Sequence, residues 1–163
     1  MSYPGMMYLL SVVILVFGVH CKEEYRGIEY PPDTSDQITI TQGVWGNVWF
    51  WEGNFMPCVP SGTITPVVRE IYVHSLTSLD SVSQIGYSPF YSEIYTQLIA
   101  ITESNSTGFF EIALPPGRYS LFVREDSLFY ANSFDGEGNI LPATVVEDSV
   151  TKTQINIDYL AYH

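Results

Sequence analysis

Apolar and polar residues alternate along most of the chain after residue 38, with the two-residue period of a β-strand. The segment 38–51, ITITQGVWGNVWFW, is the clearest case. One face of it carries Val44, Gly46, Val48 and Phe50, and the other carries Trp45, Asn47, Trp49 and Trp51. Similar patterns, rich in β-branched and aromatic residues, occupy 69–77, 97–104, 108–114, 117–125, 141–148 and 152–163.

Turn sequences separate these segments: NSTG at 105–108, LPPG at 114–117 and DGEGN at 135–139. An amphipathic helical period is limited to a turn or two around 88–95. The long interval 59–93 is expected to hold one strand and a Ser-rich excursion. About seven strands joined by turns predict an all-β protein, an antiparallel β-sandwich.

The N-terminal part follows a different pattern. Met6 to Val19 is an uncharged, apolar run that is shorter than the roughly 20 residues of a membrane span. Such a run is typical of a signal-peptide core, although the residues before it include no Lys or Arg. We therefore interpret 1–20 as a signal peptide; the alternatives are an uncleaved anchor and a buried element of the fold.

Cys21 directly follows this run. Its position resembles that of the acylated cysteine of bacterial lipoproteins, with Gly18-Val19-His20 in place of the usual small-residue box. The tetrapeptide CKEE resembles the Lys-plus-acids signal that follows the lipid cysteine in surface-exposed lipoproteins of one Gram-negative group. This resemblance predicts lipid attachment at Cys21 and a lipid-anchored protein of the outer membrane, at the cell surface.

Two other roles are open to Cys21. A disulfide with Cys58 is one, because an exported chain with two cysteines permits one bridge. A metal site with His20 is the other, but only His74 and His163 remain as imidazole ligands, and zinc needs three or four. If Cys21 is acylated, we expect Cys58 to be buried as a small apolar residue and the protein to be a monomer.

The length and charge of the chain limit the number of domains and the kinds of partner that it can have. Its 163 residues suit one domain, and apolar residues at 46% are enough for a core. Residues 21–37 are acidic, contain prolines and lack periodicity, so they predict a tether before a domain at 38–163. Six basic residues against 18 acidic ones give a net charge of −12, which excludes nucleic acid as a partner.

The segment 108–123 resembles the signature of carboxypeptidase-regulatory-like domains, which are transthyretin-like sandwiches. The matching residues are Gly108, Phe110, Ile112, Leu114, Pro115, Gly117, Tyr119, Leu121 and Val123. Upstream, the opening motif of the same domain is matched by Gly46, Val48, Gly53, Met56 and Pro57. The sequence departs from the family at Asn105, Phe50 and Cys58. The resemblance implies an accessory module without catalytic activity.

Catalytic motifs are missing from the sequence. His74 is followed by SLT rather than by the glutamate that a zinc carboxypeptidase needs, and there is no Gly-x-Ser-x-Gly elbow or phosphate loop. Glu52 and Glu111 are carboxylates that a glycoside hydrolase-like enzyme would need as a pair, but their spacing does not indicate one. We therefore expect a protein that is not an enzyme and needs no cofactor.

Two groups of residues are candidates for binding. Trp45, Trp49 and Trp51 share one side of a strand and would stack on sugars or on a protein if they are exposed; the alternative is that they cover the core. Asp135, Glu137 and Asn139 offer oxygen ligands for calcium at alternate positions, but the remaining spacing and terminal Glu of an EF-hand loop are missing, which favours a plain glycine-rich turn.

Three short triplets, Asp80-Ser81-Val82, Asp126-Ser127-Leu128 and Asp148-Ser149-Val150, resemble the O-glycosylation acceptor of the same Gram-negative group. Taken together, the sequence predicts a membrane-anchored binding or scaffolding module, with a glycan or a neighbouring outer-membrane protein as its partner. The alternative is a purely structural envelope lipoprotein without a ligand.

Overall fold

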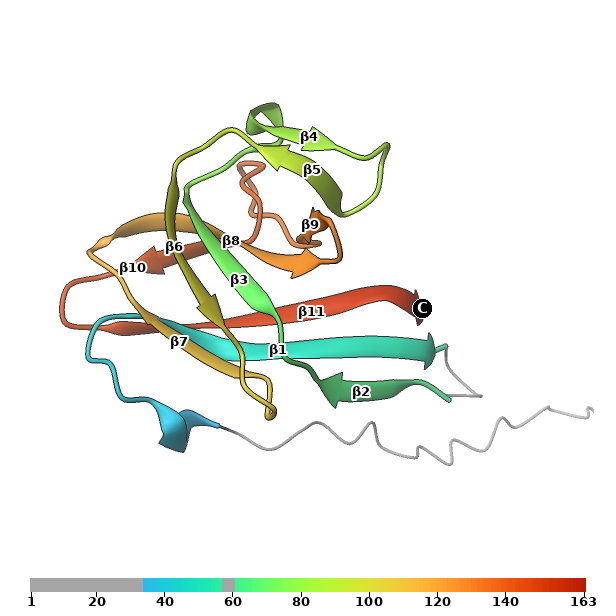
Figure 1. The fold of residues 1–163 in the computed structure, drawn as a ribbon, viewed down its shortest axis with the longest axis horizontal. Helices are drawn as coiled ribbons and strands as arrows, with labels where there is room; N and C mark the ends of the chain where they lie inside the picture. Colours follow the sequence, from blue (N-terminus) through green and yellow to red (C-terminus); the bar gives the residue numbers. More distant parts are fainter. Residues whose placement is uncertain (1–33, 57–60) are drawn as a thin grey trace, which may run out of the picture.

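The structure is a computed structural model that describes residues 34–56 and 61–163. Eleven strands and two short 3-10 turns make up this described part (Figure 1). The strands are β1 (Gly43–Asn54), β2 (Thr63–Pro66), β3 (Glu70–Ser75), β4 (Val82–Gln84), β5 (Phe90–Ile94), β6 (Leu98–Glu103), β7 (Phe109–Ala113), β8 (Gly117–Glu125), β9 (Leu128–Tyr130), β10 (Pro142–Val145) and β11 (Val150–Tyr162). The 3-10 turns are η1 (Ser35–Gln37) and η2 (Leu79–Ser81).

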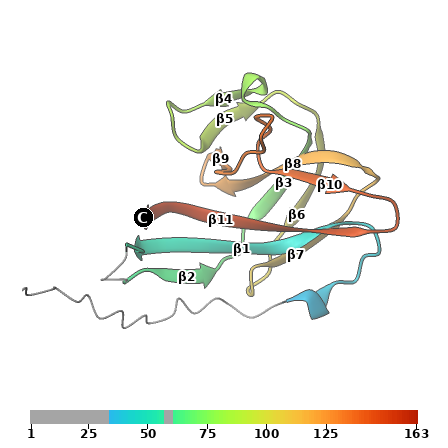
Figure 2. The ribbon, with the colours of Figure 1, turned by 180° about the vertical axis from the view of Figure 1, so that it is seen from behind.

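The first sheet is built around β1. Strand β11 pairs with β1 in parallel along its whole length, so the first and last strands of the described chain lie side by side (Figures 1 and 2). The other edge of β1 is shared: β7 pairs with its first half and β2 with its second half, both antiparallel. Strand β1 is therefore the central strand of a four-stranded sheet.

The second sheet has seven strands in the order β4-β5-β9-β8-β3-β6, and β10 pairs with the first part of β8. All of its pairs are antiparallel. Strand β6 ends this sheet and pairs only with β3 in the described part of the chain. A bulge between Val73 and His74 interrupts that pairing and leaves Ile99 as an extra residue on β6.

The core lies between the two sheets. Strand alternation brings one face of each strand into it, as the period of two requires. From the first sheet come Val44, Val48, Phe110, Ile155 and Ile157, and from the second come Ile71, Val73, Leu121 and Val123. The predicted β-sandwich is therefore confirmed.

The seven segments that alternate in sequence correspond to β1, β3, β6, β7, β8, β10 and β11. The four further strands β2, β4, β5 and β9 lie outside these segments. Three of them fall wholly or mostly within 59–93, so this interval holds more than the one strand that was expected. The weak helical pattern at 88–95 does not correspond to a helix, because Phe90–Ile94 forms strand β5 against β4 and β9. Tertiary pairing overrides such a weak local preference.

Packing of the domain begins before residue 38. Thr34 is only 3% exposed and its hydroxyl hydrogen-bonds the side chain of the buried Asn47. Gln37 accepts a hydrogen bond from Asn105 over 3.0 Å. The residues just before β1 therefore belong to the body rather than to the expected tether. The described residues contain no helix that is long and apolar enough to cross a membrane.

Candidate functional site

The three tryptophans lie on the face of β1 that points away from the core, but they do not form an exposed row. Trp45 and Trp49 are 7% and 6% exposed, and Trp51 is half-buried. Stacking on a sugar requires an open ring face. Trp45 and Trp49 offer none, so only Trp51 remains accessible for such a contact.

Identified neighbours explain the burial of this face. The Trp45 ring packs 6.3 Å from the ring of Phe109, and the ammonium group of Lys152 lies 4.8 Å from its centroid. Next to it, Thr34 closes over Asn47 with two hydrogen bonds. Side chains from both neighbouring strands, Phe109 of β7 and Lys152 of β11, therefore cover the Trp45 ring.

A small group of rings gathers where β1 and β11 end. Trp51 packs 5.1 Å from Phe55, and Phe55 stacks on His163 at 5.7 Å. Trp51 also donates a hydrogen bond from Nε1 to Asn156 Oδ1, at 3.3 Å. We call Trp51, Phe55 and His163 the terminal aromatic cluster. It combines apolar rings with neighbouring amide groups, a mixture that suits a sugar or a peptide.

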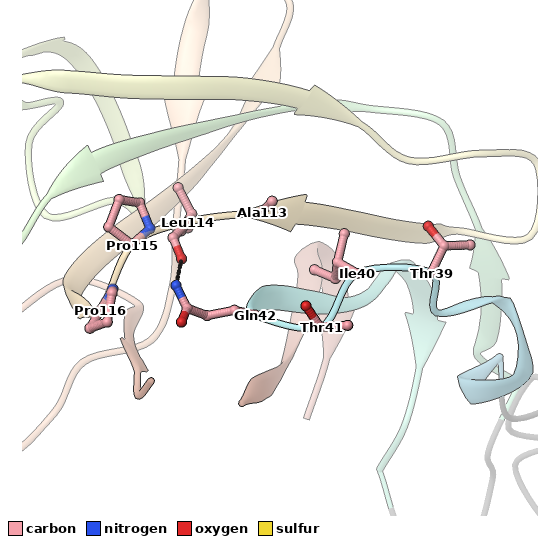
Figure 3. Close-up of a pocket in the computed structure, with 8 residues that line it drawn as sticks. All are labelled: Thr39, Ile40, Thr41, Gln42, Ala113, Leu114, Pro115 and Pro116. Carbon is pink, nitrogen blue, oxygen red and sulfur yellow. Dashed lines mark hydrogen bonds between the residues drawn. The ribbon is translucent and has the colours of Figure 1, made fainter. Parts of the chain in front are cut away.

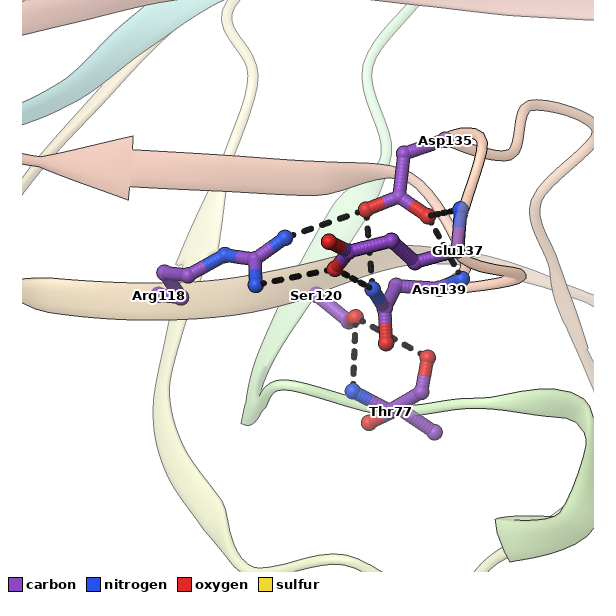
Figure 4. A network of polar contacts seen from close by, with 6 residues as sticks. All are labelled: Thr77, Arg118, Ser120, Asp135, Glu137 and Asn139. Carbon is purple, nitrogen blue, oxygen red and sulfur yellow. Dashed lines mark hydrogen bonds and ion pairs between the residues drawn. The ribbon is translucent and has the colours of Figure 1, made fainter.

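The candidate calcium ligands do come together, but around an arginine (Figure 4). The guanidinium group of Arg118 lies 3.1 Å from Asp135 and 3.3 Å from Glu137. Asp135 also accepts hydrogen bonds from the side chain of Asn139 and from the backbone of the same turn. The bond from Asn139 is the main reason that the pKa of Asp135 is lowered.

In this turn the carboxylates are already satisfied by groups of the protein itself. Arg118 supplies the positive charge that a calcium ion would otherwise bring, and Asn139 points its amide nitrogen rather than its oxygen at the carboxylates. Among residues 34–56 and 61–163, no three His, Cys, Asp or Glu side chains are grouped so that they would hold a metal ion.

The two carboxylates that were considered for glycoside hydrolysis are far apart. Glu111 lies opposite Trp45 in the β1–β7 pair, and Glu52 is seven positions further along β1. At about 3.3 Å per residue this places them roughly 23 Å apart. Glycosidases need a separation of about 5 to 9.5 Å. Glu111 is instead tied to Thr39, and that hydrogen bond is the main cause of its lowered pKa.

An open groove runs between the segment that leads into β1 and the turn that follows β7 (Figure 3). Its volume is about 620 Å³, and its wall is formed by Thr39, Ile40, Thr41, Gln42, Ala113, Leu114, Pro115 and Pro116. The side chain of Gln42 bonds the carbonyl oxygen of Leu114 at 2.9 Å and the backbone N–H of Asp148 at 3.0 Å. Gln42 therefore fixes three loops at this end of the sandwich, which is a structural role.

Exposed apolar side chains lie on two strands of the described part, on β6 and at the end of β11, where Leu160 is 48% and Tyr162 67% exposed. Those on β6 are all aliphatic. Leu98, Ile99 and Ile101 are 45%, 38% and 48% exposed. Ile101 lies opposite Tyr72 of β3 and Leu98 lies opposite His74, and residues opposite each other in an antiparallel pair point to the same side. We call Leu98, Ile99 and Ile101 the β6 strip. One signal for it is present in the sequence, because four consecutive apolar residues at 98–101 interrupt the alternation of the segment 97–104.

Ionisable residues lie near both ends of the β6 strip: His74 near one end and an acidic hollow near the other. His74 is buried and donates a hydrogen bond from Nδ1 to the carbonyl oxygen of Thr96 at 3.1 Å, and its burial lowers its pKa. At the far end of β6, a hollow of about 410 Å³ opens between the ends of β3, β6 and β8. It is lined by Val68, Arg69, Glu70, Glu103, Arg124, Glu125 and Asp126.

The remaining predicted residues are distributed over the turns or lie outside the described part. Ser127 and Ser149 are exposed in turns, and Ser81 is half-buried in η2. Cys21, with the signal segment and most of the tether, lies outside the described residues, as does Cys58.

No protein family, no curated protein and no solved structure matches this chain. The fold itself assigns the protein to the all-β sandwiches. Fold class does not define a function, so the function has to be argued from its surfaces.

Proposed function

We propose that this chain is a non-catalytic binding or scaffolding module, held at the outer membrane by a lipid on Cys21. Its partner would be a neighbouring envelope protein that docks on the β6 strip. The observation that carries the proposal is the exposure of three large aliphatic side chains close together on an edge strand. Edge strands of soluble proteins are normally protected by charges or prolines, and β6 carries only one charge, at its last residue.

The chemistry of the other surfaces supports a protein partner. Trp45 and Trp49 are buried, so the flat indole row that a polysaccharide would need is not available. The apolar β6 strip next to the half-buried Tyr72 is the kind of surface that protein interfaces cover.

The anchoring part of the proposal rests on the sequence. The uncharged run that ends at Val19, with the cysteine and the Lys-Glu-Glu sequence after it, resembles lipoprotein export signals. The resemblance of 108–123 to carboxypeptidase-regulatory-like domains agrees with an accessory role, and the two-sheet architecture is the one that it implies.

Anchoring is tested by feeding cells a labelled fatty acid. The label should enter the wild-type protein and be lost in Cys21→Ser. Retention of the label in the variant would contradict lipid attachment at this residue. The same variant should leave the membrane fraction if the lipid is what holds the protein there.

Docking is tested with a photo-crosslinking residue placed at Ile101 in the full-length protein in cells. Val146 is the matched control, because it is an aliphatic side chain that is 59% exposed but lies just after β10. We expect one discrete adduct from position 101 and none from position 146. No adduct at 101, or the same adducts at both positions, would refute docking on the β6 strip.

A second candidate function is sugar binding at the terminal aromatic cluster, which the half-buried Trp51 and the adjacent Asn156 favour. A glycan array probed with wild type, Trp51→Ala and Tyr87→Ala tests it, because Tyr87 is a fully exposed aromatic residue elsewhere. Sugar binding predicts a signal that only Trp51→Ala removes. If neither crosslinks nor glycan signals appear, the protein is a structural lipoprotein.

A further inference from the structure

The charges that line the 410 Å³ hollow at the end of β6 indicate what kind of side chain a partner would place there. Glu70 and Glu103 lie directly opposite each other in the β3–β6 pair. Both are exposed. Like charges at opposite positions of an antiparallel pair destabilise the sheet. Their arrangement therefore costs stability in the free protein unless another charge compensates it.

No such compensation comes from the described residues. The ion pairs in residues 34–56 and 61–163 are those of Arg69 with Glu125 and of Arg118 with Asp135 and Glu137, and neither Glu70 nor Glu103 takes part. Arg69 is directed to the buried Glu125 and to a backbone carbonyl.

The second arginine of the hollow is also engaged elsewhere. Arg124 lies 4.7 Å from the ring centroid of Phe129 and donates a hydrogen bond to the backbone oxygen of Asp126. Four carboxylates and two guanidinium groups line the hollow, so it keeps a negative charge with both arginines in place.

The hollow and the β6 strip form one continuous surface. Glu103 follows Ile101 by two residues on the same strand, so both point to the same side, about 7 Å apart. A segment that covers the strip with apolar side chains therefore brings its next side chain over the hollow.

We infer, resting on the proposed function, that the partner carries a Lys or Arg next to the apolar residues that cover the β6 strip, and that this side chain enters the hollow between Glu70 and Glu103. A different protein fits better than a second copy of this chain. All four basic residues of the described part, Arg69, Arg118, Arg124 and Lys152, already have partners. A net charge of −12 on each copy also opposes self-association.

Two synthetic peptides serve as defined probes. Both contain the same alternating Val-Thr stretch, and one ends in two lysines where the other ends in two glutamates. We expect the full-length protein to bind only the lysine peptide, with an affinity that falls as salt is raised. Glu70→Gln combined with Glu103→Gln should weaken this binding about fivefold or more.

The matched control combines Glu93→Gln with Glu147→Gln. These two residues are also exposed and the change in net charge is the same, but neither of them lines the hollow. We expect the control pair to change peptide binding less than twofold. Equal losses in both pairs would show a general charge effect and would overturn the inference, as would equal binding of the two peptides.

Crosslinking from Ile101 in cells separates the inference from the proposed function. An adduct whose yield drops in the Glu70→Gln, Glu103→Gln protein, and whose crosslinked peptide contains Lys or Arg, supports both. An adduct that is indifferent to these changes leaves the docking proposal standing and refutes the cationic partner. An adduct with a second copy of this chain also refutes the inference, and the lack of any adduct refutes both.

Discussion

Gly46 is the residue at which the packing of β11 against β1 is most sensitive to one added carbon. A Cβ at this position would lie 1.6 Å from the carbonyl oxygen of Thr153 on β11 and 3.2 Å from the ring of Phe110 in the core. Because ordinary contacts begin at 3.4 Å, β11 would have to move away by about 1.8 Å, the difference between 3.4 and 1.6 Å.

The cost of Gly46→Ala follows from what that movement breaks. Overpacking of a well-packed site typically costs about 1 to 3 kcal/mol. Separating β11 from β1 near Thr153 weakens ladder hydrogen bonds as well, each worth about 0.5 to 1.5 kcal/mol. We expect a loss of about 3 to 5 kcal/mol in the free energy of unfolding, which is a large part of the roughly 5 to 15 kcal/mol of a typical domain.

The assay is urea unfolding of the full-length protein, followed by tryptophan fluorescence. With a slope of about 1.5 kcal/mol per molar urea, a loss of 3 kcal/mol lowers the midpoint by about 2 M. Gly136→Ala is the matched control, because a Cβ there meets no atom within 4 Å. Its midpoint should stay near that of wild type. A Gly46→Ala midpoint within about 0.3 M of wild type would refute the close approach of β11 to β1.

Three further predictions concern the core, a histidine and the acidic turn. Phe110→Ala should cost about 3 to 5 kcal/mol in urea unfolding, because the ring is 1% exposed, whereas Phe134→Ala, at a 45% exposed position, should cost little. Burial lowers the pKa of His74 below its usual 6.5, so the unfolded chain takes up a proton near pH 6.5 while the folded chain does not. Stability should therefore be full above pH 6.5 and fall as the pH drops below it, and His74→Gln should remove this fall; an unchanged pH profile in the variant would contradict it. Finally, millimolar calcium should leave the thermal midpoint of the wild type unchanged, because Arg118 already pairs with Asp135; a calcium-dependent rise would show that the turn binds the ion.

The fold class could be predicted from the sequence because it depends on local periodicity. Each of the seven segments with alternating residues became a strand, and the residues assigned to one face of β1, Val44 and Val48, are fully buried in the core. The turns at NSTG and DGEGN could also be predicted from their glycines, because Gly108 and Gly138 adopt the positive φ angles that these turns require. Such signals lie within a few residues of each other, so no knowledge of the rest of the chain is needed.

The burial of the tryptophan-bearing face of β1 could not be predicted in this way. Alternation places Trp45 and Trp49 opposite the core, and a strand at the surface would have left them exposed. Trp45 is buried because side chains of the flanking strands, Phe109 of β7 and Lys152 of β11, pack on its ring, and Thr34 closes over the adjacent Asn47. The pairing of β1 with β11 spans more than 100 residues and its pairing with β7 more than 60, and no local pattern encodes either of them.

The same limit applies to the candidate sites. The sequence placed Asp135, Glu137 and Asn139 together, since they occur in one turn, but the arginine that neutralises them comes from β8. Likewise, Glu70 and Glu103 are 33 residues apart and face each other only because β3 and β6 pair in one particular register. Composition and period thus determined the strands and the acidic character of this protein. Only the tertiary structure decided which apolar side chains stay exposed and which like charges face each other at the surface, because that depends on which strands pair and on which strand lies at the edge of its sheet.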